Sequence, residues 1–240
     1  MTVSSENIKI KSSGQRHILY DAALIEHPDE TLFFPEVKSA DKPVMAIGRA
    51  EARFFNYQEH DLVLKQYLRG GMIAPLLGDR YFGLNRENTR SFKEFRLLHQ
   101  LQTLELPAPV PVAASAERSG LFFRAALVTK EIPNAQTLAD QLMLAVLEDS
   151  QWQDVGRCIR QFHNYDVYHA DLNARNILLS ENKVYLIDFD KGAFRYLGDS
   201  WKASNLARLK RSLLKFKSLN QEFYFDEDNW KQLLQGYSDD

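Results

Sequence analysis

The chain reads HADLNARNILL from His169 to Leu179, and a second short motif, Asp188-Phe189-Asp190, begins twelve residues after Asn176. Asp171 and Asn176 lie in a loop that leads into an apolar strand, and Asp188 follows the next apolar strand. Each of these residue types alone is common in ordinary turns. The joint order H-x-D-x-x-x-x-N, strand, turn, strand, D-F is specific, and it decides the fold.

The chemistry of this set is that of phosphoryl transfer. Such a reaction needs a group that accepts the proton of the attacking hydroxyl, and oxygen ligands that hold Mg²⁺ against the phosphates of ATP. The spacing predicts that Asp171 is the catalytic base and that Asn176 and Asp188 hold the magnesium.

The two motifs resemble the catalytic loop and the magnesium loop of the protein-kinase-like superfamily. Ala170 replaces the usual Arg of that family, which in protein kinases contacts a phosphorylated activation loop, so a constitutively active small-molecule or lipid-type kinase is favoured. Asp190 replaces the usual Gly and gives the turn less backbone freedom. The resemblance implies an α+β, two-lobed protein-kinase-like fold, with a small antiparallel β-sheet and one helix in the N-lobe and a mostly helical C-lobe.

This resemblance requires a lysine on a strand and a glutamate on a helix upstream of the catalytic loop. Lys65 lies in the strand-like run Asp61 to Tyr67, where its ammonium would meet the α- and β-phosphates. Glu94 lies in a helix with an apolar stripe and is the candidate ion-pair partner that orients Lys65. Alone, each residue would be an ordinary surface residue, but their order and distance from the loop favour the functional interpretation.

Three further ATP contacts follow only from the resemblance. The segment from Gly48 to Phe55 keeps one glycine where protein kinases carry three. Arg49 or Arg53 could compensate by pairing with phosphate oxygens, and a solvated hairpin is an equal alternative. Glu131 and Ile132 match the hinge that binds adenine through backbone groups, so Gly48, Glu131 and Ile132 are expected nucleotide contacts.

The change from strand signals to helix signals predicts two lobes. Residues 1–130 form the expected nucleotide-binding N-terminal lobe, and residues 131–240 form the C-terminal lobe with the catalytic and magnesium loops. Strands are predicted at residues 32–47, 52–57, 62–67, 121–128, 176–179 and 183–187. Helices are predicted at residues 89–103, 137–148, 151–164, 204–217 and 228–235.

Composition narrows the class and the compartment. The hydrophobic fraction of 45% indicates a folded protein, and a net charge of −2 argues against a nucleic-acid partner. The single cysteine, Cys158, falls on the apolar face of a predicted helix, which indicates burial and a reducing, cytoplasmic location. The start, Met1 to Gly14, does not have the pattern of a signal peptide. No stretch reaches the roughly 20 apolar residues that span a bilayer, so membrane contact is expected to be peripheral.

The resemblance narrows to the 3-deoxy-D-manno-octulosonic acid (Kdo) kinases, which belong with the lipopolysaccharide core heptose kinases. It is carried by the segment from Thr89 to Leu98, by Tyr168 to Leu179 and by Leu186 to Gly192, and it extends from about Phe33 to about Leu214. It implies transfer of the γ-phosphate of ATP to the 4-hydroxyl of the Kdo residue of Kdo-lipid IVA. The implied location is the cytoplasmic face of the inner membrane, with peripheral attachment.

Three sequence features bear on an anionic lipid-linked acceptor, and the last two have a structural alternative. The segment from Arg69 to Leu77 combines a cation with an apolar turn, and a basic run follows in the second half: Lys202, Arg208, Lys210, Arg211, Lys215 and Lys217. This run suits an anionic membrane surface or, equally, is the solvated face of an amphipathic helix. Arg175 could pair with the Kdo carboxylate or could be structural.

Other functions stay open at this stage. A heptose or aminoglycoside phosphotransferase type of sugar kinase would share the same residues, and a pseudokinase scaffold would explain the glycine-poor loop. A protein kinase is disfavoured because no Ala-Pro-Glu segment follows and the tract after Asp190 is short.

Overall fold

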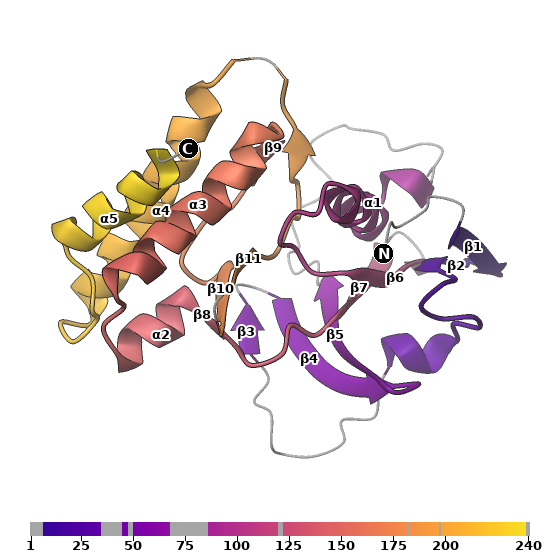
Figure 1. Ribbon diagram of the computed structural model, residues 1–240. Coiled ribbons are helices and arrows are strands. Elements are labelled where there is room, and N and C mark those ends of the chain that lie inside the picture. Colours follow the sequence, from indigo (N-terminus) through magenta and orange to yellow (C-terminus); the bar gives the residue numbers. More distant parts are fainter. Residues whose placement is uncertain are drawn as a thin grey trace. The chain divides into compact units, whose positions relative to one another are not determined.

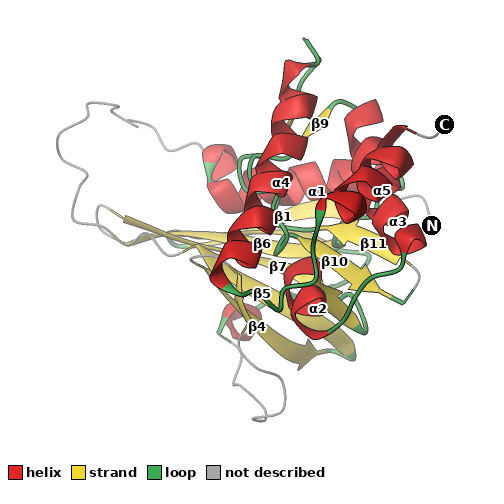
Figure 2. Cartoon of the chain, turned by 90° about the vertical axis from the view of Figure 1, so that its left-hand side faces the viewer, coloured by secondary structure: helices red, strands yellow, loops and turns green. Residues whose placement is uncertain are grey.

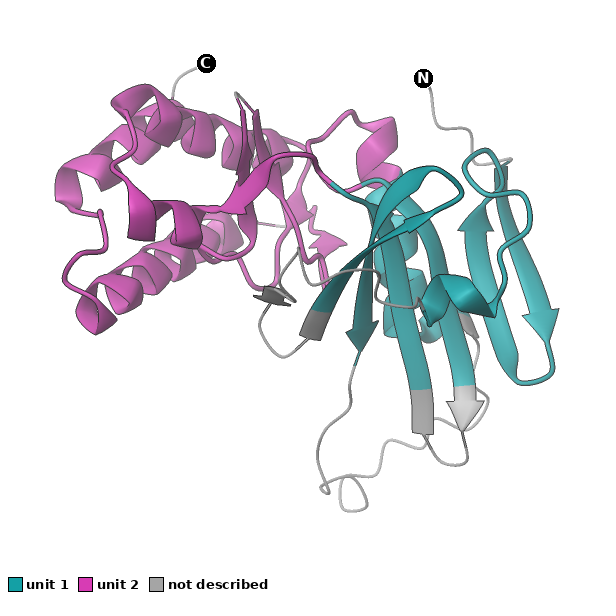
Figure 3. Cartoon of the chain, turned by 90° about the horizontal axis from the view of Figure 1, so that it is seen from below, with its two compact units in different colours: residues 1–99, 110–131 teal, residues 100–109, 132–240 magenta. Residues whose placement is uncertain are grey.

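The computed structural model describes residues 7–34, 45–47, 50–67, 86–119, 122–181, 183–196 and 198–238. The chain divides into two compact units, which Figure 3 shows in different colours. Unit 1 contains residues 1–99 and 110–131, and unit 2 contains residues 100–109 and 132–240. The chain therefore crosses between the units three times, and the last crossing falls between Glu131 and Ile132.

Unit 1 is built on one antiparallel sheet, which Figure 2 shows in yellow. Its described strands follow the order β1-β2-β6-β7-β5-β4-β3, and every neighbouring pair is antiparallel. The strands are β1 (Ile8–Ser13), β2 (Arg16–Asp21), β3 (Met45–Ile47), β4 (Ala50–Tyr57), β5 (His60–Tyr67), β6 (Pro111–Ser119) and β7 (Phe122–Lys130). Two 3-10 helices, η2 (Glu30–Phe33) and η3 (Arg86–Asn88), and the helix α1 (Arg90–Thr103) accompany it.

The predicted meander is confirmed in β3, β4 and β5, and the helix predicted at residues 89–103 is α1. The strand predicted to begin at Leu32 is wrong at its start, because Leu32 and Phe33 lie in η2. There Asp29 caps the turn by accepting a hydrogen bond from the backbone N–H of Thr31 at 2.9 Å. Residues 35–44 of that run lie outside the described residues.

Side-chain alternation along β5 separates the two faces of the sheet, one of which packs on a buried apolar cluster. Leu62 and Leu64 are fully buried in a cluster that also contains Leu32 and Phe33 of η2 and Val128 of β7. Since successive side chains point to opposite faces of a sheet, odd-numbered residues of β5 face the other way. That parity directs the side chain of residue 65 away from this cluster.

Unit 2 combines four helices, drawn in Figure 1 from coral to yellow, with short strands. The helices are α2 (Leu138–Leu144), α3 (Asp149–Asn164), α4 (Ser200–Leu219) and α5 (Glu227–Ser238). The strands are β8 (Ala135–Thr137), β9 (Val167–Tyr168), β10 (Ile177–Ser180), β11 (Lys183–Leu186) and β12 (Ala193–Phe194). All four predicted helices are confirmed, with different ends. Within the described part of the chain, no helix has the length and apolar character needed to cross a membrane.

Helices α3 and α5 lie side by side in Figure 1, and two glycines permit their close approach. A Cβ atom at Gly156 would lie 2.1 Å from the carbonyl oxygen of Leu233, and one at Gly236 would lie 2.1 Å from that of Gln153. These contacts are with backbone atoms, so rotation of a side chain cannot relieve them.

Cys158 lies in α3 and is buried, as the sequence predicted. Its Sγ donates to the carbonyl oxygen of Val184 at 3.5 Å, and burial raises the pKa of the thiol. A buried thiol with a raised pKa is inert, because the thiolate is the reactive form.

We expect Gly156→Ala to destabilise the protein by about 3 kcal/mol, which lowers Tm by roughly 6–12 °C, because α3 and α5 must separate. The comparison variant is Gly14→Ala, where the added Cβ meets nothing within 4 Å and only the φ of +56° opposes the change. That strain costs about 1 kcal/mol. Thermal denaturation followed by circular dichroism measures both, and equal losses would contradict the close-packing argument.

Candidate active site

The loop from His169 to Asn176 has a backbone held by its own side chains. The carbonyl oxygen of Asp171 accepts hydrogen bonds from Asn173 Nδ2 at 3.0 Å and Asn176 Nδ2 at 2.9 Å. Asn173 Oδ1 in turn accepts from the backbone N–H of Arg175 at 2.8 Å. The backbone of Asp171 is thereby fixed, while its side chain is 60% exposed and available to a substrate.

His169 ties the two motifs together from a buried position. Its Nε2 lies 2.9 Å from the carbonyl oxygen of Ile187, and the backbone N–H of Asp171 donates to its Nδ1 at 3.2 Å. Since a carbonyl oxygen only accepts, Nε2 carries the proton and Nδ1 is the acceptor. The neutral imidazole therefore bridges the residue before Asp188 and the backbone of Asp171.

Asn176 and Asp188 are brought near each other by the backbone. Ile187, which precedes Asp188, donates its N–H to the carbonyl oxygen of Asn176 at 3.0 Å. This bond extends the antiparallel register of β10 and β11, in which Ile177 pairs with Leu186. Asn176 is buried, and its amide nitrogen is used on Asp171, so the amide oxygen is the atom that can bind a ligand.

The turn after Asp188 forms without the glycine that kinases usually have at the position of Asp190. Asp188 has a φ of +63° and Lys191 has a φ of +62°, whereas Asp190 is not left-handed. The turn closes when the N–H of Gly192 donates to the carbonyl oxygen of Phe189 at 2.8 Å. No glycine is needed at position 190, because the left-handed residues of this turn are Asp188 and Lys191.

Phe189 anchors this turn in the core of unit 2. Its ring stacks on Phe162 of α3 at a centroid distance of 5.5 Å and lies 4.8 Å from the ring of His169. The central residue of the Asp188-Phe189-Asp190 motif thus packs against the same histidine that holds Asp171.

Helix α4 supports the catalytic loop through one polar stripe, which sequence reasoning missed. Asn205 Nδ2 donates to the carbonyl oxygen of His169 at 2.9 Å, and Ser212 Oγ accepts from the N–H of Ala174 at 3.3 Å. Between them, Arg208 Nη1 donates to Asp171 Oδ1 at 3.2 Å. These three residues share one face of a helix, since they are spaced i, i+3 and i+7. That polar periodicity was the signal available in the sequence.

The support continues behind Asn205 into a buried histidine. His163 Nε2 lies 3.4 Å from Asn205 Oδ1, and its Nδ1 lies 2.8 Å from the hydroxyl of Tyr237. Because Asn205 Oδ1 only accepts, Nε2 is the donor and the Tyr237 hydroxyl donates to Nδ1. Burial lowers the pKa of His163 to about 4, with smaller effects from Lys202 and His169 in the same direction.

In unit 1, Lys65 and Glu94 form the ion pair expected from their order in the sequence. Lys65 Nζ lies 2.9 Å from Glu94 Oε1 and 2.8 Å from Oε2, and the glutamate side chain is only 3% exposed. The hydroxyl of Tyr67 also donates to Glu94 Oε2, and the Lys65 ammonium lies 4.8 Å from the Tyr67 ring centroid. Residues 65 and 67 point to the same face of β5, which explains why both reach α1.

Of the remaining predicted nucleotide contacts, Glu131 and Ile132 lie within the described residues and Gly48 does not. Glu131 donates its backbone N–H to the carbonyl oxygen of Asp61 at 2.9 Å, so contact with adenine there would use its own carbonyl oxygen. Ile132 is the first residue of unit 2 after the crossing. Gly48 and Arg49 lie outside the described residues, whereas Arg53 lies in β4.

Arg175 points its guanidinium toward α4. Its Cζ lies 5.3 Å from the ring centroid of Phe216, a cation–π contact. The sequence leaves two roles open for Arg175, a ligand of a carboxylate or a structural residue. The contact that the structure shows is this stacking on Phe216.

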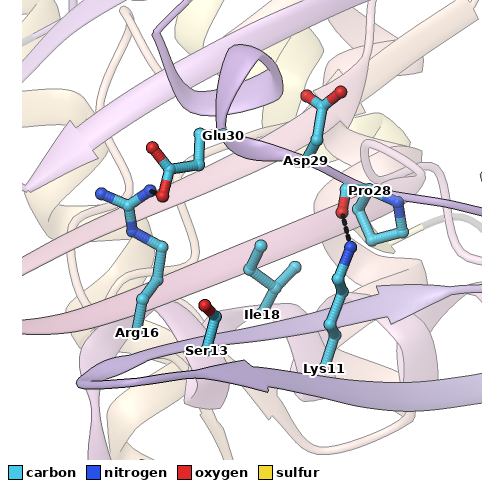
Figure 4. Close-up of a pocket in the computed structure, with 7 residues that line it drawn as sticks. All are labelled: Lys11, Ser13, Arg16, Ile18, Pro28, Asp29 and Glu30. Atoms are coloured by element: carbon cyan, nitrogen blue, oxygen red, sulfur yellow. Dashed lines mark hydrogen bonds and ion pairs between the residues drawn. The ribbon is translucent and has the colours of Figure 1, made fainter.

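A cavity of about 130 Å³ in unit 1 lies apart from these residues (Figure 4). Its charged groups have partners: Lys11 Nζ donates to the carbonyl oxygen of Pro28 at 3.0 Å, and Arg16 forms ion pairs with Glu30 at 2.5 Å and Glu117 at 2.7 Å. The cavity is lined by Lys11, Ser13, Arg16, Ile18, Pro28, Asp29 and Glu30. The bonds to Pro28 and Glu30 attach η2 and the residues before it to the β1–β2 hairpin, and the ion pair with Glu117 joins β2 to β6. These are structural contacts.

The fold and the catalytic loop define the class. A solved structure of WaaP in complex with acyl carrier protein matches with a TM-score of 0.52 and 14% sequence identity, over 80% of this chain and 76% of that one. At that identity the match shows the fold, which is the α+β kinase-like fold that the sequence predicted.

The family is shown by sequence. The Lipopolysaccharide kinase (Kdo/WaaP) family matches residues 39–237, and the chain belongs to it. Proteins named 3-deoxy-D-manno-octulosonic acid kinase are 40% identical in Actinobacillus succinogenes and in Xanthomonas campestris pv. campestris, and 36% identical in Vibrio vulnificus. The alignments cover 87%, 93% and 96% of this chain and 91%, 90% and 98% of the relatives. The protein is thus an ATP-dependent phosphotransferase.

His163 makes stability depend on pH. The unfolded chain binds a proton near the ordinary pKa of 6.5 and the folded chain only near 4, so the contribution of the neutral imidazole is complete above pH 6.5 and is lost as pH falls toward 4. The loss is about 3 kcal/mol. We expect His163→Gln to flatten the free energy of unfolding between these pH values, measured by urea denaturation. The exposed His27→Gln serves as control; an unchanged slope in His163→Gln would contradict the assignment.

Proposed function

We propose that the protein transfers the γ-phosphate of ATP to the 4-hydroxyl of the Kdo residue of Kdo-lipid IVA. The observation that carries the acceptor is the similarity, along nearly the whole chain, to proteins named 3-deoxy-D-manno-octulosonic acid kinase. The observation that supports the chemistry is a loop that fixes the backbone of Asp171 and leaves its carboxylate exposed.

In this mechanism each residue of the chain has one task. Asp171 accepts the proton of the sugar hydroxyl as that oxygen attacks the γ-phosphorus and ADP leaves in line. Lys65, oriented by Glu94, steadies the α- and β-phosphates. Backbone groups of Glu131 and Ile132 contact adenine, and Gly48 belongs to the loop that covers the phosphates. Positioning and neutralisation of charge supply most of the rate.

Asn176 and Asp188 would hold Mg²⁺. Among the described residues, no group of three or more His, Cys, Asp or Glu side chains could bind a metal by itself. One carboxylate and one amide oxygen still suit Mg²⁺ in a kinase, since this ion takes its other ligands from water and substrate phosphates. The amide oxygen of Asn176 is directed by the bond that its nitrogen makes. When bound, the ion neutralises negative charge on the phosphates.

The proposed location is the cytoplasmic face of the inner membrane, with peripheral attachment. The support is the acceptor, which is a membrane lipid, and the basic residues of α4, where Arg208, Arg211 and Lys215 are exposed. Each surface cation near an anionic membrane contributes on the order of 1 kcal/mol. The segment from Arg69 to Leu77, which has the second membrane signal in the sequence, lies outside the described residues.

The test is transfer of labelled γ-phosphate from Mg-ATP to purified Kdo-lipid IVA, with lipid IVA that lacks Kdo as the control acceptor. We expect label on the Kdo-bearing lipid alone. Asp171→Asn should lower turnover by roughly 10²- to 10⁴-fold with little effect on ATP binding, because only proton acceptance is lost. Label on both lipids, or on neither, would reject the proposed acceptor, and an Asp171→Asn protein with wild-type turnover would reject the base.

Asp188 is tested by ligand-induced stabilisation. A nucleotide that binds only the folded protein raises Tm by mass action. We expect Mg-ATP to raise the Tm of the wild-type protein and to leave that of Asp188→Ala nearly unchanged, because the metal ligand is lost. Differential scanning fluorimetry measures both. An equal rise in the two proteins would show that Asp188 does not hold the metal.

A further inference from the structure

The contact between Arg208 and Asp171 differs from the other contacts that α4 makes with the catalytic loop. Asn205 and Ser212 bond to backbone atoms of His169 and Ala174, and these bonds hold the loop in place. Arg208 instead bonds to the carboxylate of the catalytic base. A cation on a helix therefore lies beside the group that is proposed to bind the acceptor hydroxyl.

The geometry and exposure of this ion pair are those of a weak contact, which another anion can replace. One guanidinium nitrogen lies 3.2 Å from one carboxylate oxygen, whereas charge-assisted bonds of this kind are usually about 2.7–2.9 Å long and often bidentate. The side chains of Arg208 and Asp171 are 47% and 60% exposed. An exposed pair of this kind adds little to stability, so a better anionic partner can replace it.

Arg175, the arginine within the loop, makes a different contact. Arg175 places its guanidinium over the ring of Phe216, which lies further along α4. Of the two arginines, Arg208 is the one whose guanidinium lies at the carboxylate of Asp171 in the structure.

We propose that Arg208 binds the carboxylate of the acidic sugar acceptor. Resting on the proposed function, this assignment names the part of Kdo that the enzyme recognises, since Kdo carries its carboxylate on the same ring as the 4-hydroxyl. When the sugar binds, Arg208 moves from Asp171 Oδ1 to the sugar carboxylate, where its planar fork can form two parallel bonds. The exchange places the hydroxyl beside Asp171 and leaves that carboxylate able to accept a proton.

Selectivity follows from the same exchange. A neutral sugar offers no anion, so Arg208 stays on Asp171 and the base remains paired. The carboxylate thus becomes a condition for both binding and orientation, which is how a site built for a charged group rejects an analogue that lacks it.

The test is a cycle of two enzymes and two acceptors. Wild type and Arg208→Gln are each assayed with Kdo-lipid IVA and with its analogue in which the Kdo carboxylate is a primary amide. We expect Arg208→Gln to lower kcat/KM for Kdo-lipid IVA by about 10²-fold, mainly through the KM for the acceptor. We expect wild type to lose a similar factor on the amide, and Arg208→Gln to lose little more on it, because the two changes remove the same contact.

Two further variants separate charge and fold from recognition. Arg208→Lys keeps the charge without the fork and should recover only part of the loss. Arg157→Gln is the matched control, because Arg157 forms a comparable exposed ion pair with Asp154, at 2.7 Å and with side chains 42% and 45% exposed, away from the loop. The KM for ATP and the ATP-induced rise in Tm should be unchanged in all three variants.

The outcomes distinguish this assignment from the function on which it rests. A wild-type enzyme inactive on Kdo-lipid IVA would overturn the proposed function and the assignment with it. In another outcome, the wild type is active while Arg208→Gln lowers kcat/KM, relative to wild type, by the same factor for Kdo-lipid IVA and for the amide. That result would overturn the assignment alone, and would indicate that Arg208 acts on the base or on the transferred phosphoryl group. If the amide turns over too slowly, calorimetric binding of both acceptors completes the same cycle.

Discussion

The active-site loop depends on one constraint: its buried polar groups must find partners within unit 2. A buried donor or acceptor left unpaired costs about 1–3 kcal/mol, and bonds in a low-dielectric interior reinforce one another. His169 satisfies both ring nitrogens with backbone groups, one on each motif. Asn205 satisfies the backbone of His169 and is itself met by His163. A chain of hydrogen bonds therefore runs from Tyr237 of α5 through His163 and Asn205 to His169 and the backbone of Asp171, the proposed catalytic base.

In the same arrangement, the groups that stabilise the loop differ from the group that is proposed to react. The residues that fix the loop, His169, Asn205 and His163, are buried, whereas the carboxylate of Asp171 is exposed. A rigid backbone with an accessible functional group is what positioning requires, since misplacement by about an ångström can cost 10²-fold in rate. Asp188 adds a left-handed backbone conformation at a functional position. Aspartate tolerates this region better than most residues, and the buried Phe189 beside it holds the conformation in place.

Sequence spacing was sufficient to predict the site where its residues are brought together by short stretches of chain. The order of Asp171, Asn176 and Asp188 predicted a loop, a hairpin and a second loop, and β10 and β11 form that hairpin. Lys65 and Glu94 could be paired because the resemblance to the protein-kinase-like superfamily implies a lysine on a strand and a glutamate on a helix upstream of the catalytic loop. Asn205 and Arg208 could not be assigned in this way. Their contacts with the loop join residues 36 and 37 positions apart. The polar spacing along the helix is visible in the sequence, but it does not identify the distant segment that this face contacts.

The proposed base lies in a loop and the proposed acceptor-binding arginine lies on α4, so the two can be altered separately. The proposed catalytic base, Asp171, lies in a loop whose backbone is fixed by hydrogen bonds, so a change to that loop is expected to alter the chemistry itself. Arg208 lies on a helix whose other polar contacts, from Asn205 and Ser212, already hold the loop. A substitution at position 208 leaves those bonds in place. Under the proposed assignment, the acceptor's charge is recognised by a residue that is not needed to build the loop, and functional groups on rigid elements are the more accurately placed.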